Sequence, residues 1–446
     1  MTSQMIFQLV ILLAAIAIGA RAGGVGMGLW GGVGLLIVVF VTRAAPGSIP
    51  GEVLLIILTV IMAASAMEAA GGIDYLVKIA AGLIRKSPRH VTIIAPLVSY
   101  VFTFLSGTGH IFYPLIPVIY EVAMKGRVRP ERPIAVSTIA SQQAITASPV
   151  SAATAAMIAL LGAKGVGLVQ ILLICVPSTL IGVLVAALVQ TRIGVELDQD
   201  PEYQRRLASG ELTPPTETDT AALEGKNSAS NRGGALSAWM FLVAVFLVVC
   251  CGLFPNLRKV GTEAAPVTVS MPMTIAIVMM GVAAAMLLFT RTSATTLVKT
   301  KTCQAGITAV IGILGLAWLG DTFIDDNSKV IIGGLSHMAE SYPASFALGL
   351  FVTSMLLYSQ AATTQTLMPL GLTLGIAPAA LAGMFPAVNG YFFIPTYGTL
   401  IAAVNFDRSG TTRIGKYVLN HSFMIPGLVS TLVAVSTGLL IAKIFF

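Results

Sequence analysis

Runs of about 20 apolar residues recur along the chain, and this feature restricts the fold more strongly than any other. Each run can cross a hydrocarbon core of roughly 30 Å as a helix. Only 10% of the residues are charged and the mean hydropathy is +0.89, which excludes an ordinary soluble domain. The short alternating strands of a membrane barrel are absent. The sequence therefore predicts an all-α polytopic membrane protein.

The apolar stretches fall into two groups. The uninterrupted ones predict membrane spans at residues 5–20, 24–42, 52–71, 168–190, 235–254, 267–290, 303–320 and 421–445. The others carry polar and helix-breaking residues at mid-depth, and they cover residues 91–124, 134–162, 344–383 and 386–404. Non-helical backbone at that depth is tolerated only where protein buries it or where it lines a cavity.

Both kinds of stretch follow the same order in each half of the chain. We therefore expect one repeat over residues 1–190 and a second over 235–446, each with three spans, an amphipathic piece, an interrupted pair, an interrupted single span and a closing span. The amphipathic pieces are residues 73–84 and 328–338. Residues 191–234 are polar and contain no apolar run, which predicts a solvated cytoplasmic linker.

Basic residues orient this layout in the bilayer. The loops at residues 85–89 and 125–132 are both rich in Lys and Arg, so they share the cytoplasm if 91–124 is a re-entrant hairpin. The flanks of the second hairpin, 337–343 and 374–386, contain neither Lys nor Arg. The second hairpin is therefore expected to open outwards. This arrangement predicts an inverted repeat with two re-entrant hairpins (91–124 and 344–383), two broken helices (134–162 and 386–404) and both termini in the periplasm.

Inverted repeats with broken helices are typical of secondary transporters, whose half-helix amino termini hold anions near the midplane. The interruptions here carry hydroxyl and amide groups, which are neutral donors for carboxylate oxygens. The predicted substrate-binding residues are Ser106, Gly107, Thr108, Gly109, His110, Gln142, Ser148, Pro149, Ser151, Ser359, Gln360, Thr363, Thr364, Asn389, Pro395, Thr396 and Thr399. For any single Ser or Thr the alternative is a bond within its own helix, and for Pro149 and Pro395 a simple kink.

Few ionisable residues lie at depth. His110 lies in the tip of the first hairpin. It either contacts the substrate or transfers a proton, or it only forms a hydrogen bond within the tip. Glu68, near the end of a span, either titrates or pairs with a ligand, or lies at the membrane interface, which is the interpretation we favour. Gly24, Gly28 and Gly32 recur at four-residue spacing, which indicates a close-packing face between helices.

No motif for another class of protein is found. The chain lacks HExxH, GxSxG and P-loop motifs, so we expect no enzyme, cofactor or metal site. Its four cysteines have no CxxC spacing and are expected to be reduced packing residues. The excess of basic residues lies between spans, so no nucleic-acid partner is implied. An intramembrane hydrolase or a receptor-like scaffold remains the alternative of another class, but it lacks a nucleophile constellation.

Long motifs resemble one known family. Residues 106–114 (SGTGHIFYP), 129–133 (RPERP), 406–412 (FDRSGTT) and 420–423 (NHSF) are similar to the anaerobic C4-dicarboxylate transporter (Dcu) family over nearly the whole chain. The resemblance implies an antiporter of the bacterial inner membrane that exchanges fumarate, succinate, malate and aspartate. Wider relatives of that family imply an elevator-type motion, and we expect a homo-oligomer, with a dimer as the working guess.

One departure from the family narrows this expectation. Members tied to fumarate respiration and to a sensor kinase carry Tyr-Pro-Ser-Asp after the second break, where this chain has Tyr397, Gly398, Thr399 and Leu400. The resemblance therefore favours the general aspartate/fumarate branch without a sensor role. The alternative within transport is a sodium- or proton-coupled carboxylate symporter on the same architecture.

Overall fold

The computed structural model describes residues 3–22, 25–47, 51–212, 232–262, 265–312, 314–315, 318–323, 325–327, 343–357, 359–394, 397–415 and 419–446. These residues form helices almost throughout. The first part of the chain forms α1 (Ser3–Ala22), α2 (Val25–Thr42), α3 (Gly51–Ala69), α4 (Gly72–Arg85), η1 (Pro88–His90), α5 (Val91–Ser106), η2 (Gly109–Phe112), α6 (Leu115–Lys125), α7 (Glu131–Ala147), α8 (Ala152–Leu161), η3 (Gly162–Lys164) and α9 (Leu168–Gln190).

The remainder continues the helical fold with one small sheet. It forms η4 (Leu197–Gln199), α10 (Pro201–Ala208), α12 (Arg232–Leu253), η5 (Pro255–Arg258), β1 (Lys259–Thr262), β2 (Ala265–Thr268), α13 (Met271–Thr290), α14 (Ala294–Leu297), α15 (Lys301–Gly312), α17 (Pro343–Leu357), α18 (Gln360–Thr373), α19 (Pro378–Met384), η7 (Phe385–Phe392), α20 (Gly398–Phe406) and α21 (Met424–Phe445). Strands β1 and β2 pair antiparallel, with Val260 opposite Val267.

Within the described ranges, six helical stretches are long and apolar enough to cross a membrane. They are Pro88–Ser106, Glu131–Lys164, Leu168–Gln190, Arg232–Leu253, Met271–Thr290 and Met424–Phe445. Leu54–Ala69 and Gly72–Arg85 add a seventh if they form one span, bent by 73°. These helices confirm the prediction of an all-α polytopic membrane protein.

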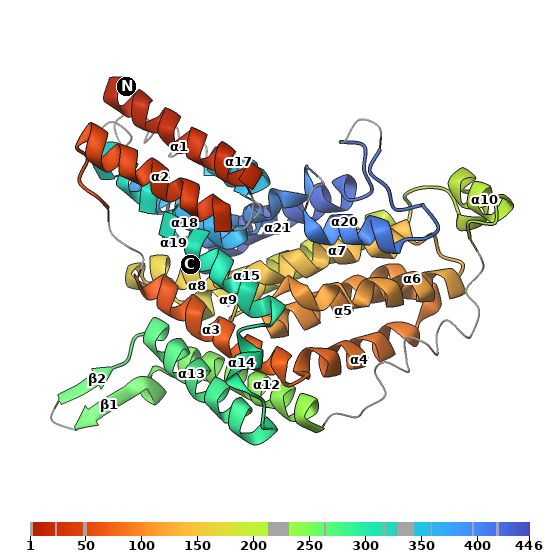
Figure 1. Ribbon diagram of the computed structural model, residues 1–446, viewed down its shortest axis with the longest axis horizontal. Helices are drawn as coiled ribbons and strands as arrows, with labels where there is room; N and C mark the ends of the chain where they lie inside the picture. Colours follow the sequence, from red (N-terminus) through yellow and green to blue (C-terminus); the bar gives the residue numbers. More distant parts are fainter. Residues whose placement is uncertain are drawn as a thin grey trace.

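The longest helices follow the long axis of the molecule, with the β1–β2 hairpin at one end and α10 at the other (Figure 1). Helix α7 lies at the centre and packs against α5, α9 and α21. Almost all of its residues are buried, because it is built from small and polar side chains that suit contact with other helices better than contact with lipid. Ser141 of α7, for example, shares a 2.9 Å hydrogen bond with Thr103 of α5.

Glycine permits the closest helix contacts. A Cβ on Gly383 of α19 would lie 2.7 Å from the carbonyl oxygen of Gly438 in α21, and one on Gly438 would lie 2.5 Å from the carbonyl oxygen of Gly383. The predicted close-packing glycine face is confirmed at Gly28, where a Cβ would overlap the carbonyl of Ile311. A Cβ on Gly32 would meet open space, and Gly24 lies outside the described residues. The four cysteines form no disulfide, and Cys250 is only half-buried.

The first part of the predicted linker is folded. Helix α10 begins with Asp200 accepting from the backbone N–H groups of Glu202 and Tyr203, both at 3.0 Å. Leu197, Tyr203 and Leu212 pack with Met124 at the end of α6. A polar segment thus gains a small core of its own, and the rest of the linker, residues 213–231, lies outside the described residues, as does the predicted amphipathic piece 328–338.

Candidate functional site

The first interruption is a sharp turn after α5. Helix α5 ends at Ser106, and Gly107 adopts a left-handed conformation with φ of 68°. A Cβ at this position would lie 2.8 Å from the carbonyl oxygen of Val150, in the interruption between α7 and α8. Only glycine fits both the backbone angle and the close approach. The two interruptions of the first half therefore touch.

The second interruption separates α7 from α8 at residues 148–151. Ser148 donates a 2.7 Å hydrogen bond to the carbonyl of Phe104, which ties this break to α5. Ser151 caps α8 by accepting from the N–H of Thr154 at 3.1 Å. The hydroxyls on either side of Pro149 thus define where one helix stops and the next begins.

The second half is interrupted near Ser359 and again before α20. Ser359 caps α18 by accepting from the N–H of Ala362 at 3.2 Å. Helix α18 begins directly after this cap, so the predicted residues Thr363 and Thr364 lie within a regular helix. Their hydroxyls donate to the carbonyls of Ser359 and Gln360 four residues earlier. Pro395 and Thr396 in the second break lie outside the described residues.

A cavity of about 200 Å³ lies where the interruptions meet. It is lined by nine of the predicted residues: Ser106, Gly107, Thr108, Gly109, Gln142, Ser151, Ser359, Gln360 and Thr399. Five other predicted residues do not line it: Ser148, Pro149, Thr363, Thr364 and Asn389. The backbone of His110 belongs to η2 next to the lining residues, and its side chain is not among the described parts.

Besides α15, whose first N–H groups are capped by Glu68, three helices begin at this cavity. Residues at the amino-terminal ends of α8, α18 and α20 belong to its lining. Each helix start exposes backbone N–H groups and a partial charge of roughly +0.5. Together the three ends form a neutral but electropositive wall that favours an anion.

Two buried hydroxyl groups at the cavity have no hydrogen-bond partner in the described part of the chain. They belong to Thr399 of α20 and to Thr302 of α15. Buried hydroxyls are normally paired, so these two lining residues are candidates for contact with a ligand. Thr302 is not among the residues predicted from the sequence, because it precedes the predicted span 303–320 and no motif surrounds it.

Glu68 positions Thr302. Its carboxylate accepts from the backbone N–H groups of Lys301 and Thr302, at 3.2 and 3.0 Å. These are the first N–H groups of α15, so Glu68 acts as a cap supplied by a neighbouring helix. The interfacial residue expected from the sequence therefore fixes the start of a helix at the cavity.

Part of the cavity lining is apolar. Ile57, Val60, Ile61 and Ala64 recur on one face of α3, and all four line it. Gly306 of α15 packs directly against Ile61. The cavity thus combines polar helix ends with a hydrocarbon surface.

Buried amides at the cavity link helices from both halves. Gln360 donates to Gln142 at 3.0 Å and to Asn389 at 3.3 Å. Asn389 in turn donates to Gln143 at 3.1 Å, and Gln143 donates to Thr431 of α21 at 3.0 Å. Asn389 therefore supports the lining residue Gln360 directly, and Gln142 only through Gln360.

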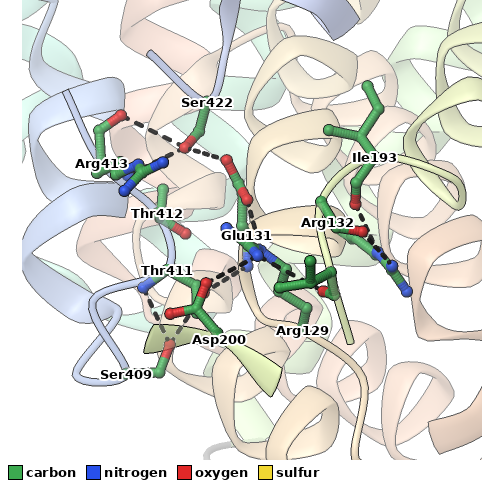
Figure 2. Close-up of polar contacts among 12 residues, drawn as sticks. Arg129, Glu131, Arg132, Ile193, Asp200, Ser409, Thr411, Thr412, Arg413 and Ser422 are labelled. Carbon is green, nitrogen blue, oxygen red and sulfur yellow. Dashed lines mark hydrogen bonds and ion pairs between the residues drawn. The ribbon is translucent and has the colours of Figure 1, made fainter. Parts of the chain in front are cut away.

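A second polar cluster joins the folded linker to both halves (Figure 2). Arg129 is buried between Glu131 at 2.6 Å and Asp200 of the linker at 2.8 Å. Glu131 accepts from Ser422 at 2.6 Å, and its backbone N–H donates to Thr411 at 3.1 Å. Figure 2 shows these side chains converging from three separate segments.

Comparison with known proteins decides the family. The family described as "Anaerobic c4-dicarboxylate membrane transporter" matches residues 4–446. The chain belongs to this family. It is 40% identical to the "C4-dicarboxylate transporter DcuA" of Wolinella succinogenes, over 99% of this chain and 100% of that protein. The "Anaerobic C4-dicarboxylate transporter DcuB" of Escherichia coli O157:H7 is 37% identical over 98% of each chain.

These matches confirm a multi-pass transporter of the inner membrane and not an enzyme, as expected from the resemblance. The "C4-dicarboxylate transporter DcuA" of Escherichia coli strain K12 is 39% identical over 99% of each chain. Among solved structures, Neisseria gonorrhoeae MtrF, described with "a Class of Antimetabolite Efflux Pumps", aligns with a TM-score of 0.48 at 12% identity, over 100% of this chain and 95% of that one.

Proposed function

We propose that this transporter exchanges C4-dicarboxylates by binding the dianion in the cavity between the interrupted helices. The observation that carries the proposal is the meeting of three helix amino termini and two unpartnered threonine hydroxyls at one cavity. The helix ends would receive the carboxylates, and the apolar face of α3 would contact the carbons between them. The names of the relatives support this substrate class.

The size and charge of the cavity suit a small dianion. At about 200 Å³ it is smaller than pockets for drug-sized ligands, which span roughly 300–1,000 Å³. Three helix ends supply roughly +1.5 in partial charge, which compensates most of two negative charges. Fumarate, succinate, malate and aspartate are the substrates we expect, and the proposed binding residues are the predicted set that lines the cavity, with Thr302 added.

We propose that the chain consists of two inverted repeats, 1–190 and 235–446, with re-entrant hairpins at α5–α6 and α17–α18. Matching contacts support it: α5 packs on α7 as α17 packs on η7, α8 meets α18 as α6 meets α20, and the closing helices α9 and α21 pack together. Basic loops on one side support a cytoplasmic linker and periplasmic termini.

The motion and the assembly are part of the same proposal. Hairpins and broken helices would move as one block against α1–α3 and α12–α15, as in an elevator. The buried amide network supports such a block, because it ties α7, α18, η7 and α21 into one unit. A dimer would provide the fixed scaffold.

Counterflow in proteoliposomes tests the proposal. Vesicles preloaded with succinate should take up labelled fumarate, and uptake should fall at least tenfold in Thr399→Val and Thr302→Val, since each loses one donor to a carboxylate. Thr366→Val is the matched control, because Thr366 bonds its own helix and does not line the cavity. Uptake that needs a sodium gradient and not internal succinate would favour the symporter instead. Wild-type rates in both cavity variants would reject the site.

A further inference from the structure

A second cleft, of about 570 Å³, lies where the loop after α4 meets the loop after α6. Its lining includes the basic side chains of Lys86, Arg89, Lys125 and Arg127, together with His90. Among the residues that the structure describes, no Asp or Glu lines it. An occupant of this cleft therefore meets positive charge from both loops.

The nearest carboxylates are already engaged. Glu121 forms ion pairs with Lys125 at 2.8 Å and with Arg85 at 3.5 Å. Asp198 is 3.8 Å from Arg127, and both side chains are largely exposed. Lys86 and Arg89 have no ion pair among the residues described. The cleft thus keeps an excess of positive charge.

Backbone packing holds the two basic loops together. A Cβ on Gly126 would lie 2.6 Å from the carbonyl oxygen of Pro88, so the loops approach as closely as glycine allows. Like charges held this way repel one another, and a bound anion removes that repulsion.

Two exposed apolar residues of α4 precede the cleft. Ile79 and Leu83 of α4 are 39% and 44% exposed, and Lys86 continues the same helical face. Gly82 between them leaves open space beside the helix. The cleft also lies at the end of Pro88–Ser106, a helix long enough to span the membrane. It therefore lies at the level of lipid headgroups.

We propose that this cleft binds the phosphate headgroup of an anionic phospholipid, with an acyl chain along Ile79 and Leu83. Arginine and lysine in a pocket at the end of membrane helices are suited to phosphate, and Arg can donate to it in a bidentate manner. The site is separate from the cavity and does not depend on which anion is transported.

Native mass spectrometry of the purified protein with added phosphatidylglycerol or phosphatidylcholine tests the proposal. Lys86→Gln/Arg89→Gln/Arg127→Gln should bind phosphatidylglycerol at least tenfold more weakly and phosphatidylcholine unchanged. The control Arg192→Gln/Lys299→Gln/Lys443→Gln removes the same charge from exposed positions that do not line the cleft, and it should bind both lipids as the wild type does. Equal losses in both triple variants would overturn the proposal, because the effect would then follow net charge alone.

Two further variants separate a lipid from a free anion. Gly126→Val changes no charge but forces the loops apart, so it should also lose phosphatidylglycerol binding. Leu83→Gln should weaken phosphatidylglycerol binding severalfold. Displacement of the lipid by millimolar inorganic phosphate or succinate, with Leu83→Gln binding as the wild type, would show a soluble-anion site and reject the lipid. The result for Gly126→Val counts only if this variant remains monodisperse. If it does not, the triple variant of the cleft residues decides the outcome.

Discussion

At the scale of single residues, Gly107 shows how one position restricts the site. Its left-handed backbone costs other residues roughly 1–2 kcal/mol, and its close approach to Val150 adds steric overlap. Gly210, after α10, has a similar φ of 73° but open space around its missing Cβ. The two glycines therefore separate the cost of the backbone angle from the cost of the contact.

We predict that Gly107→Ala lowers the melting temperature of the detergent-purified protein more than Gly210→Ala does. Both substitutions strain the backbone, but only the first pushes a methyl group into the carbonyl of Val150. Differential scanning fluorimetry measures the shift, and counterflow on the surviving protein should be reduced only for Gly107→Ala. Equal shifts for the two variants would show that the interruptions do not depend on this contact.

At the scale of elements, the caps decide where the electropositive helix ends point. Ser151 and Ser359 end the interruptions and direct the starts of α8 and α18 at the cavity. Aspartate caps a helix as well as serine does and also suits the helix dipole, whereas alanine loses about 1 kcal/mol. The capping hydrogen bond and the charge at the helix end can therefore be changed separately.

We predict that Ser359→Asp keeps the stability of the wild type but abolishes dicarboxylate counterflow. The new carboxylate preserves the cap. It also neutralises the partial positive charge at the start of α18, to which a substrate carboxylate would otherwise bind. Ser359→Ala should lose stability by about 1 kcal/mol yet retain more transport than Ser359→Asp. Thermal unfolding and counterflow, measured on the same preparations, give the two readouts, and robust transport by Ser359→Asp would show that α18 does not face the substrate.

At the scale of the whole molecule, the linker is part of the fold. Arg129, Glu131 and Asp200 form a buried ion cluster that extends through Ser422 to the start of α21. Removing one member of a buried cluster leaves an unpaired charge, which costs far more than losing an exposed pair. In α10, by contrast, Arg205 pairs at the surface and, with Arg206, lowers the pKa of Glu202 to about 2.

We predict that Arg129→Ala destabilises the protein by about 3–5 kcal/mol, since Asp200 loses its buried partner. Arg205→Ala removes an exposed pair and should have little measurable effect. Thermal unfolding compares the two, and limited proteolysis should cleave the segment around α10 faster only in Arg129→Ala. Similar behaviour of the two variants would mean that the linker is not held by the cluster.

The orientation makes a further prediction at this scale. In a Cys250→Ser background, cysteine placed at exposed Val267 of the hairpin should react with an impermeant reagent added to whole cells, and cysteine at Lys86 should not. The proposed topology places these two positions on opposite sides of the membrane. Labelling at Lys86 from outside would reverse the orientation and with it the periplasmic termini.

Local patterns were sufficient for most of the helices, but not for α10 in the predicted solvated linker or for the β1–β2 hairpin. The apolar runs predict the spans because about 20 residues must cover the hydrocarbon core, and the glycine and serine interruptions predict the breaks because backbone at that depth needs a partner or a cavity. They also placed Ser106, Ser151, Ser359 and Thr399 among the candidates that line the cavity. The family followed from motifs that are continuous in sequence.

Only the tertiary structure decided which of these residues meet. Thr302 lines the cavity because Glu68, from another helix, caps α15 there. Thr363 and Thr364 do not line it, and their hydroxyls bond carbonyls of the preceding turn. Asp200 belongs to a segment predicted to be solvated, but in the structure it pairs with Arg129, which is distant in sequence. Helix formation and membrane insertion depend on near neighbours in the chain, whereas the pairing of a buried polar group depends on distant segments that arrive together.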